Sequence, residues 1–230
     1  MARFRRLEVL SEITRIGLVP IFYHPEVDAA QQIVTACSAG GARVVEFTNR
    51  GDNAFWVFSQ LVSQLEGTHP DVILGVGSVM DPATAAVYIG AGANLIVSPV
   101  LNPDIAQVCN RHKVAHIPGC ATPSEISEAE AGGAEIVKLF PGNLVGGPEF
   151  IRAIHGPMPW TRIMPTGGVK AEQASLAAWF AAGAAAVGIG SSLIGEDLTS
   201  AHDFQSLTER VVQVIAWIQE ARDKKVEEAA

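Results

Sequence analysis

The chain has 230 residues, of which 48% are hydrophobic, so it can bury one large core or two smaller ones. Its 24 acidic residues outnumber its 16 basic residues, and the net charge of −8 argues against general nucleic-acid binding and against binding to anionic membranes. No apolar segment is long enough to span a bilayer, and Glu8 and Glu12 interrupt the basic start, so we expect neither a membrane span nor a signal peptide.

The three cysteines, Cys37, Cys109 and Cys120, are odd in number and far apart. No Cys-x-x-Cys pair and no Cys/His cluster has the spacing of a zinc site, so we expect no metal. We expect all three to be small core residues, and their pattern fits a reducing cytoplasm.

Residues 3–16 have apolar side chains at helical spacing and predict a leading amphipathic helix. Short apolar runs then alternate with alanine-rich helical segments. The apolar runs are residues 18–23, 43–48, 72–78, 94–99, 114–119, 136–140, 162–168 and 185–191. The helical segments are residues 27–39, 53–65, 82–90, 103–111, 123–131, 148–154, 171–181 and 201–221. Asp52, Asp81 and Asp104 stand at or near the starts of such segments and are expected as helix caps.

Strands that alternate with helices predict a parallel sheet, because each crossover must return to the same end. Eight such units predict a single (β/α)₈ TIM barrel, with an extra N-terminal helix (1–17), the barrel (18–222) and a frayed tail (223–230). An open doubly wound sheet is the alternative, but the first apolar run is followed by Tyr23-His24-Pro25-Glu26 rather than by a glycine-rich phosphate turn.

Lys138 interrupts the apolar run 136–140 and is the lysine with the most unusual setting. Lysine is rarely buried without a reason, and burial disfavours the charged amine. A neutral amine can condense with a ketone to form a Schiff base. A structural lysine that pairs with a core carboxylate is the alternative.

Glu46 interrupts its own apolar run in the same way. Because side chains alternate along a strand, Glu46 and Thr48 share one face, as do Lys138 and Phe140. A Glu46–Lys138 ion pair that serves only the fold is possible, but buried ion pairs are costly, which favours a functional role. Arg50 follows the same strand and is suited to bidentate binding of a substrate carboxylate.

The seventh and eighth apolar runs end in Thr166-Gly167-Gly168 and Gly190-Ser191. Barrels commonly bind phosphate at these two strand ends, where glycines let backbone N–H groups approach an anion. His116 is expected to be a core residue, whereas His24 follows the first strand and could line the mouth.

Several segments form a pattern in order between Leu18 and Leu193. They are residues 44–50 (Val-Val-Glu-Phe-Thr-Asn-Arg), 75–78 (Gly-Val-Gly-Ser), 98–99 (Ser-Pro), 117–119 (Ile-Pro-Gly), 137–141 (Val-Lys-Leu-Phe-Pro), 165–168 (Pro-Thr-Gly-Gly) and 188–191 (Gly-Ile-Gly-Ser). Together they resemble the 2-keto-3-deoxy-6-phosphogluconate (KDPG) and 4-hydroxy-2-oxoglutarate (KHG) aldolase family. The family also includes 2-keto-3-deoxy-6-phosphogalactonate aldolases.

The resemblance implies a trimeric class I aldolase that needs no metal or other cofactor and acts on a small keto-acid phosphate. It implies that Lys138 forms the Schiff base and that Glu46 is the general acid/base. Pyruvate binding would fall to Arg50, Ser78, Pro99 and Phe140, and phosphate binding to Thr166, Gly167, Gly168, Gly190 and Ser191.

The chain departs from the family in three places. The family usually has threonine at Ser78, often has an apolar residue at Asn49, and often has arginine near the end of the first strand, where this chain has Tyr23-His24. The resemblance as a whole predicts cleavage of KDPG to pyruvate and glyceraldehyde 3-phosphate. The alternatives within the family are cleavage of 4-hydroxy-2-oxoglutarate or of 2-keto-3-deoxy-6-phosphogalactonate. A phosphosugar isomerase or epimerase barrel, and a barrel that binds a sugar acid without turnover, are alternatives of other classes.

Overall fold

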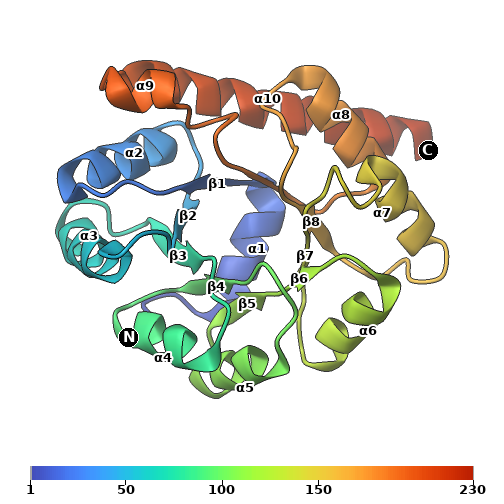
Figure 1. The fold of residues 1–230 in the computed structure, drawn as a ribbon. Coiled ribbons are helices and arrows are strands. Elements are labelled where there is room, and N and C mark those ends of the chain that lie inside the picture. Colours follow the sequence, from blue (N-terminus) through green and yellow to red (C-terminus); the bar gives the residue numbers. More distant parts are fainter. Residues whose placement is uncertain (1, 230) are drawn as a thin grey trace.

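The computed structural model describes residues 2–229 and shows parallel strands that alternate with helices along the chain (Figure 1). The strands are β1 (Leu18–Phe22), β2 (Val44–Thr48), β3 (Ile73–Gly77), β4 (Leu95–Val97), β5 (Ala115–Ile117), β6 (Gly119–Cys120), β7 (Val137–Leu139), β8 (Ile163–Pro165) and β9 (Val187–Ile189). The helices are α1 (Arg6–Ile16), α2 (Val27–Ala39), α3 (Ala54–Thr68), α4 (Pro82–Gly90), α5 (Pro103–His112), α6 (Pro123–Ala131), α7 (Gly147–His155), α8 (Gln173–Ala182), α9 (Glu196–Ser200) and α10 (Phe204–Ala229).

The strands form two sheets, one in the order β5-β4-β3-β2-β1-β9 and one in the order β6-β7-β8. Every strand pairing in them is parallel, as the alternating pattern predicts. Only Pro118 separates β5 from β6, and a bridge between Thr166 and Gly188 connects the segment after β8 to β9. The sheets curl around a common centre with helices outside (Figure 1).

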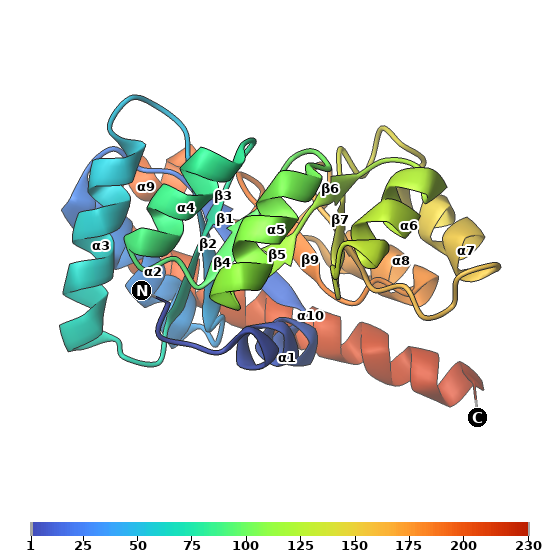
Figure 2. The same cartoon turned by 90° about the horizontal axis from the view of Figure 1, so that it is seen from below.

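The inner side of the curled sheet is filled with apolar side chains, and α1 contributes to it. The inner core consists of Val9, Leu10, Ile13, Val19, Val44, Ile73, Leu95, Val97, Ala115, Ile117, Ile136, Met164 and Ala186. Because Val9, Leu10 and Ile13 belong to this cluster, α1 covers the end of the sheet where the strands begin (Figure 2). Helix α1 does not cover the opposite end, where the strands finish, and polar side chains can lie there.

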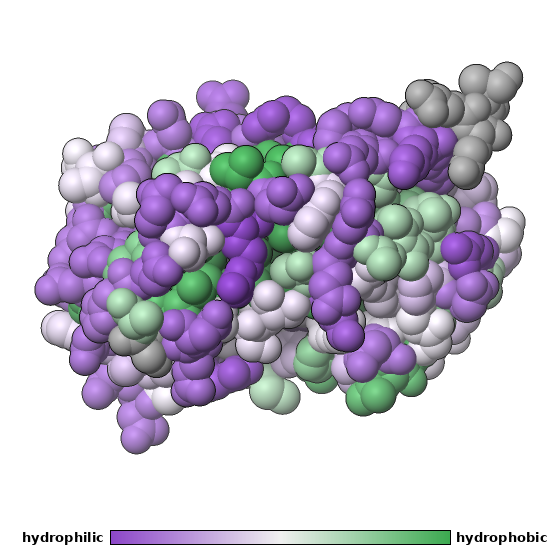
Figure 3. Space-filling model, turned by 90° about the horizontal axis from the view of Figure 1, so that it is seen from above, coloured by the Kyte–Doolittle hydropathy of each residue, from purple (hydrophilic) through white to green (hydrophobic). Residues whose placement is uncertain are grey.

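A larger outer core lies between the strands and the surrounding helices. α10 packs against α2 and α8, and Arg222 connects it to two further elements. The Arg222 guanidinium donates to the carbonyls of Thr14 and Arg15 at the end of α1 and to that of Ala185 before β9. The face that carries α8, α9 and α10 is mostly hydrophilic, with hydrophobic patches between the polar side chains (Figure 3).

Three details of the structure differ from the prediction or go beyond it. The fifth strand is divided into β5 and β6, because Pro118 has no N–H to continue the ladder. The short helix α9 was not predicted. Helix α10 continues through the segment expected as a frayed tail as far as Ala229, where lysine, glutamate and alanine favour helix, and fraying of this segment stays a prediction.

Candidate active site

Lys138 and Glu46 both lie inside the curled sheet, 5% and 1% exposed. Lys138 is in the middle of β7, where its neighbours in register are Gly119 on β6 and Met164 on β8. Glu46 is in the middle of β2, opposite Gly75 on β3. The inner core therefore lies on one side of these two charged groups, and the carboxyl ends of the strands lie on the other.

The Glu46 carboxylate occupies space that a glycine leaves open. A Cβ atom at Gly77 would lie 1.7 Å from Glu46 Oε1, so no other residue could stand at this position without displacing the carboxylate. The other oxygen, Oε2, is buried and has no hydrogen-bond partner among the described residues. A buried acceptor without a partner is uncommon in native proteins and points to a role for a bound molecule.

Burial raises the pKa of Glu46 above its usual value, and the charge of Lys138 opposes that rise. The two groups therefore interact electrostatically. Within residues 2–229, however, they form no ion pair at 4.0 Å or less. Lys138 Nζ instead lies 5.1 Å from the centre of the Phe140 ring, on the same face of the chain. This arrangement does not support a tight ion pair that serves only the fold.

Ser78 and Pro99 follow β3 and β4 at the same end of the sheet and are half-buried. Ser78 has φ 61°, an uncommon conformation for a residue with a side chain, and such backbone strain is often found at functional sites. Pro99 lies close to Gly119, because a Cβ atom at Gly119 would be 2.3 Å from the Pro99 carbonyl carbon. Gly119 is the register neighbour of Lys138, so Pro99 lies near the lysine strand.

Arg50 follows β2 and is exposed. Its guanidinium makes no hydrogen bond or ion pair with any residue that the structure describes. The side chain is therefore available to an external anion.

Thr166, Gly167 and Gly168 follow β8 beside the turn after Phe140. Gly142 N–H donates to Thr166 O and Asn143 N–H donates to Gly167 O, at 2.8 and 3.2 Å. Gly167 and Gly168 have φ 84° and 77°, which favour glycine. Asn143 was not among the predicted residues, but its side chain occupies the space beside Gly168, 2.2 Å from where a Cβ of Gly168 would be.

Gly190 and Ser191 follow β9, which is joined to Thr166 through the Thr166–Gly188 bridge. Thr166 Oγ1 is a second buried polar atom without a partner among the described residues. In the same part of the chain, the backbone N–H groups of Gly168 and Ser191 donate to no acceptor among residues 2–229. Donors of this kind at neighbouring strand ends suit an anion.

The two histidines singled out by the sequence have different settings. His116 is buried, and burial lowers its pKa to about 4, so the ring is neutral. Its Nε2 lies 3.1 Å from Ser98 Oγ, whereas its Nδ1 has no partner in the described chain. His24 is half-buried and its Nδ1 accepts a hydrogen bond from Glu26 N–H.

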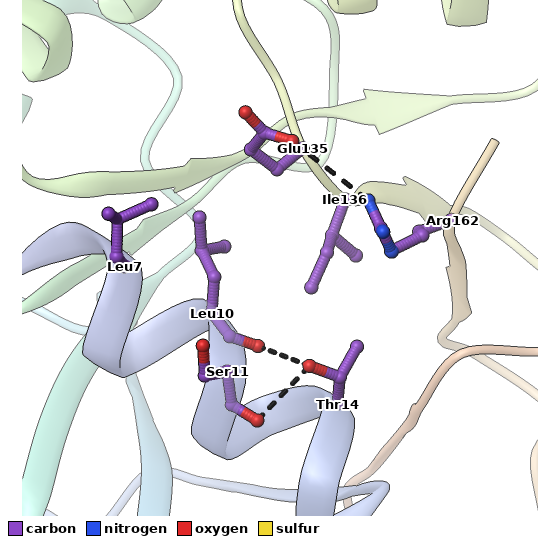
Figure 4. A pocket seen from close by; sticks show the side chains of 7 residues that line it. All are labelled: Leu7, Leu10, Ser11, Thr14, Glu135, Ile136 and Arg162. Atoms are coloured by element: carbon purple, nitrogen blue, oxygen red, sulfur yellow. Dashed lines mark hydrogen bonds and ion pairs between the residues drawn. The ribbon is translucent and has the colours of Figure 1, made fainter. Parts of the chain in front are cut away.

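Two surface cavities are found, and neither is lined by Lys138, Glu46 or Arg50. One, of about 260 Å³, is at the opposite end of the molecule, between α1 and the residues before β7 and β8 (Figure 4). The other, of about 550 Å³, lies between the start of α2 and α3. Among residues 2–229, no cluster of three or more His, Cys, Asp or Glu side chains is arranged to hold a metal ion, and no helix could span a membrane.

Comparison with known proteins points to one family. The family described as KDPG and KHG aldolase matches residues 9–210. The 2-dehydro-3-deoxy-phosphogluconate aldolase of Pseudoalteromonas atlantica is 32% identical over 203 residues, which are 86% of this chain and 90% of that protein. The KHG/KDPG aldolase of Escherichia coli K12 is 31% identical over 160 residues, which are 70% and 73% of the two chains.

A solved structure gives the same result. The crystal structure of KDPG aldolase from Legionella pneumophila, with pyruvate captured at low pH as a covalent carbinolamine intermediate, superposes with a TM-score of 0.81 at 27% identity. The superposition covers 90% of this chain and 97% of the Legionella pneumophila chain. From the family match over residues 9–210 and from these relatives, this chain belongs to the KDPG and KHG aldolase family and is a lyase.

Proposed function

We propose that this enzyme cleaves KDPG to pyruvate and glyceraldehyde 3-phosphate through a Schiff base on Lys138. The observation that carries the proposal is the burial of Lys138 and Glu46 inside the same curled sheet, where the charge of Lys138 acts on Glu46 but no ion pair of 4.0 Å or less forms between these two described residues. An amine nucleophile and a carboxyl group with a raised pKa are the two groups that such a reaction needs. Proton shuttling by an isomerase or epimerase would not require the buried amine.

The chemistry follows from these two side chains. The Lys138 amine attacks the C2 carbonyl, and loss of water gives a protonated imine. When Glu46 takes the proton of the C4 hydroxyl, the C3–C4 bond breaks and its electron pair moves to the imine, which releases the aldehyde and leaves an enamine. Glu46 then returns the proton to C3, and hydrolysis frees pyruvate and the amine.

The remaining expected residues divide into two groups along the substrate. Arg50 and Ser78 would hold the pyruvate carboxylate, beside Pro99 and Phe140. The distal phosphate would lie over Thr166, Gly167, Gly168, Gly190 and Ser191. The backbone N–H groups of Gly168 and Ser191, which have no acceptor in the described part of the chain, support an anion site there.

We further propose that the two sheets form one closed eight-stranded barrel. The bridge between Thr166 and Gly188 at one edge, and the continuation of β5 into β6 at the other, support closure. A closed barrel would bring the pyruvate groups on β2–β4 and the phosphate groups on β8 and β9 around a single mouth.

The proposal includes a homotrimer in the cytoplasm. Large apolar side chains are exposed on neighbouring elements: Phe55 on α3, Val87 on α4, and Met80 and Val100 on the loops that follow β3 and β4. Phe55 packs on Tyr88, beside Val87, and Asn102 Nδ2 donates to Met80 O, so these side chains belong to one region. We call these four side chains the α3–α4 apolar surface, and it supports self-association. The three cysteines are free and buried, as a reducing compartment allows.

Borohydride trapping tests the central step. Incubation with pyruvate and borohydride should produce a reduced adduct at Lys138, and Lys138→Met should abolish it. Glu46→Gln should still form the adduct, because imine formation depends on the amine. An adduct at another lysine, or no adduct in the wild-type enzyme, would contradict the mechanism.

The preferred substrate needs a separate experiment. Pyruvate release should be compared for KDPG, for the galactonate analogue and for 4-hydroxy-2-oxoglutarate. Equal cleavage of the unphosphorylated substrate would favour the KHG activity named for the Escherichia coli relative.

A further inference from the structure

We propose that Tyr88, acting through Asn49, is a positioning residue that fixes the orientation of Arg50 at the mouth of the site. The inference rests on the proposed role of Arg50 as the binder of the substrate carboxylate. Tyr88 is on α4 and Asn49 directly follows β2, and Tyr88 Oη donates to Asn49 Oδ1 at 2.7 Å. This hydrogen bond joins a helix to the residue that precedes Arg50.

Tyr88 is a rigid partner for this contact. It is only 2% exposed, and its ring packs edge-on against Phe58 and Phe55 of α3, at centroid distances of 5.0 and 5.5 Å. Burial raises the pKa of Tyr88 to about 12, with a smaller contribution from Tyr23, so the hydroxyl stays protonated at the pH of any aldolase assay. A fixed, protonated donor defines the position of its acceptor.

Asn49 is held from two sides. Its side chain bonds to Tyr88, and its backbone N–H donates to Gly77 O on β3 at 2.8 Å. Gly77 is the residue that leaves space for the Glu46 carboxylate and precedes Ser78. Through these two hydrogen bonds, Asn49 connects the start of the β2–α3 loop both to Tyr88 and to β3, the strand next to the Glu46 carboxyl group.

Arg50 has no comparable anchor of its own. Its guanidinium has no partner among residues 2–229, so the direction of its side chain depends on the backbone on either side. On the far side, Gly51 has φ 87°, and a Cβ atom there would lie 2.7 Å from Tyr23 Oη. Tyr23 therefore packs against the backbone after Arg50 without a hydrogen bond to any described residue, whereas Tyr88 holds the residue before Arg50 by a hydrogen bond.

The substitution Tyr88→Phe tests the hydrogen bond with little change of shape. We expect the pyruvate concentration that gives half-maximal borohydride trapping at Lys138 to rise by about fivefold, the usual effect of one lost hydrogen bond. The rate at saturating substrate should stay within about twofold, and inhibition by inorganic phosphate should be unchanged, because phosphate binds at the other end. Asn49→Leu should have the same effect, and the two substitutions together should cost no more than either alone.

Tyr23→Phe is the matched control, since it is the same chemical change in the other neighbouring tyrosine. The Tyr23 hydroxyl makes no hydrogen bond to a described residue, so this variant should behave like the wild type. If Tyr88→Phe lowers only the melting temperature and leaves pyruvate trapping unchanged, the positioning role is overturned.

A double-mutant cycle with Arg50→Gln separates this inference from the proposed function. Tyr88→Phe should have no further effect on pyruvate trapping in the Arg50→Gln background. If Arg50→Gln itself leaves trapping unchanged, the carboxylate-binding role of Arg50 is wrong. If Arg50→Gln weakens trapping and Tyr88→Phe adds its full effect to it, Arg50 binds the carboxylate but Tyr88 does not position it.

Discussion

Glu46 is a carboxyl group whose properties are set by burial, and its effect on stability has a definite sign. Its native pKa is raised above the ordinary value of 4.5, so between the two values the folded protein binds more protons than the unfolded chain. The contribution of Glu46 to stability is therefore complete below the unfolded pKa and is lost as the pH rises through the native pKa. Glutamine does not ionise, so Glu46→Gln should remove the loss of stability that the ionisation of Glu46 causes as the pH rises.

We predict that Glu46→Gln gains stability relative to the wild type as the pH rises from about 4 to about 8, as measured by urea unfolding. Glu125→Gln is the matched control with the opposite sign. The pKa of Glu125 is lowered, first by a hydrogen bond from Ala121 N–H, so the cost of its removal should increase as the pH rises toward the ordinary value of 4.5 and change little above it. Parallel pH profiles for the two variants would contradict the assigned environments.

Gly190 allows a test of the proposed phosphate site. Its φ lies outside the left-handed region, and a Cβ atom there would meet only Ile21 O at 3.7 Å, so alanine fits the fold. A methyl group should nevertheless prevent close approach of an anion to the backbone. Gly190→Ala should raise KM for the phosphorylated substrate by about tenfold or more, the value of a lost hydrogen bond to a charged group.

Exchange of the methyl protons of pyruvate with deuterium is the control for this variant, because pyruvate does not reach the phosphate end. Exchange should be unchanged in Gly190→Ala. Gly168 would be a poor choice for the same test, since φ 77° and contact with Asn143 mean that alanine there would disturb the fold. An unchanged KM in Gly190→Ala would show that the phosphate lies elsewhere.

Among the elements, α1 stabilises the molecule without taking part in the site. Ile13 is fully buried in the inner core, at the end of the strands opposite Lys138 and Glu46. Ile13→Ala should lower the free energy of unfolding by about 2–5 kcal/mol, because it leaves a cavity in a packed core. Pyruvate exchange at a temperature well below unfolding should not change.

Leu7→Ala is the control on the same helix. Leu7 is 74% exposed and borders the cavity between α1 and the strands, so the free energy of unfolding should change by less than about 0.5 kcal/mol. Equal losses for the two variants would mean that the inner face of α1 is not buried as described.

The helix ends show which local signals the sequence carries. Asp81 caps α4 as predicted, because its carboxylate accepts from Thr84 N–H at 2.8 Å. The predictions for Asp52 and Asp104 are wrong: Asn53 precedes α3 without a side-chain cap bond, and Asn102 caps α5 by accepting from Asp104 N–H. Several cap-forming residues stand close together at these starts, and only the backbone geometry decides which one is used.

For the whole molecule, the alternation of strands and helices was enough to predict the parallel α/β fold. The alternation of side chains along each strand was enough to predict that Glu46 and Lys138 could both face the interior of the sheet. The sequence could not place α1, because an amphipathic helix shows that one face is buried but not what covers it. It could not reveal the Tyr88–Asn49 contact either. Those residues are 39 positions apart, on a helix and a strand end that only the tertiary fold brings together.

Assembly is tested by charging the α3–α4 apolar surface. Val87 is 51% exposed there, and a glutamate buried against another subunit would be costly. Val87→Glu should shift the mass measured by light scattering from trimer toward monomer. Val212→Glu, at a similarly exposed valine on α10, should leave the mass unchanged. A monomeric wild-type protein would contradict the trimer.

The apolar inner core on one side of Glu46 and Lys138 affects which substitutions can alter the substrate preference of the enzyme without unfolding it. The side chains that hold the strands together lie toward one end of the molecule, and those proposed to contact substrate lie at the other. Substitutions in the loops after the strands can therefore alter substrate preference while the core that sets stability stays the same. A mutant library restricted to those loops should retain folded members at a higher frequency than one of equal size directed at the inner core.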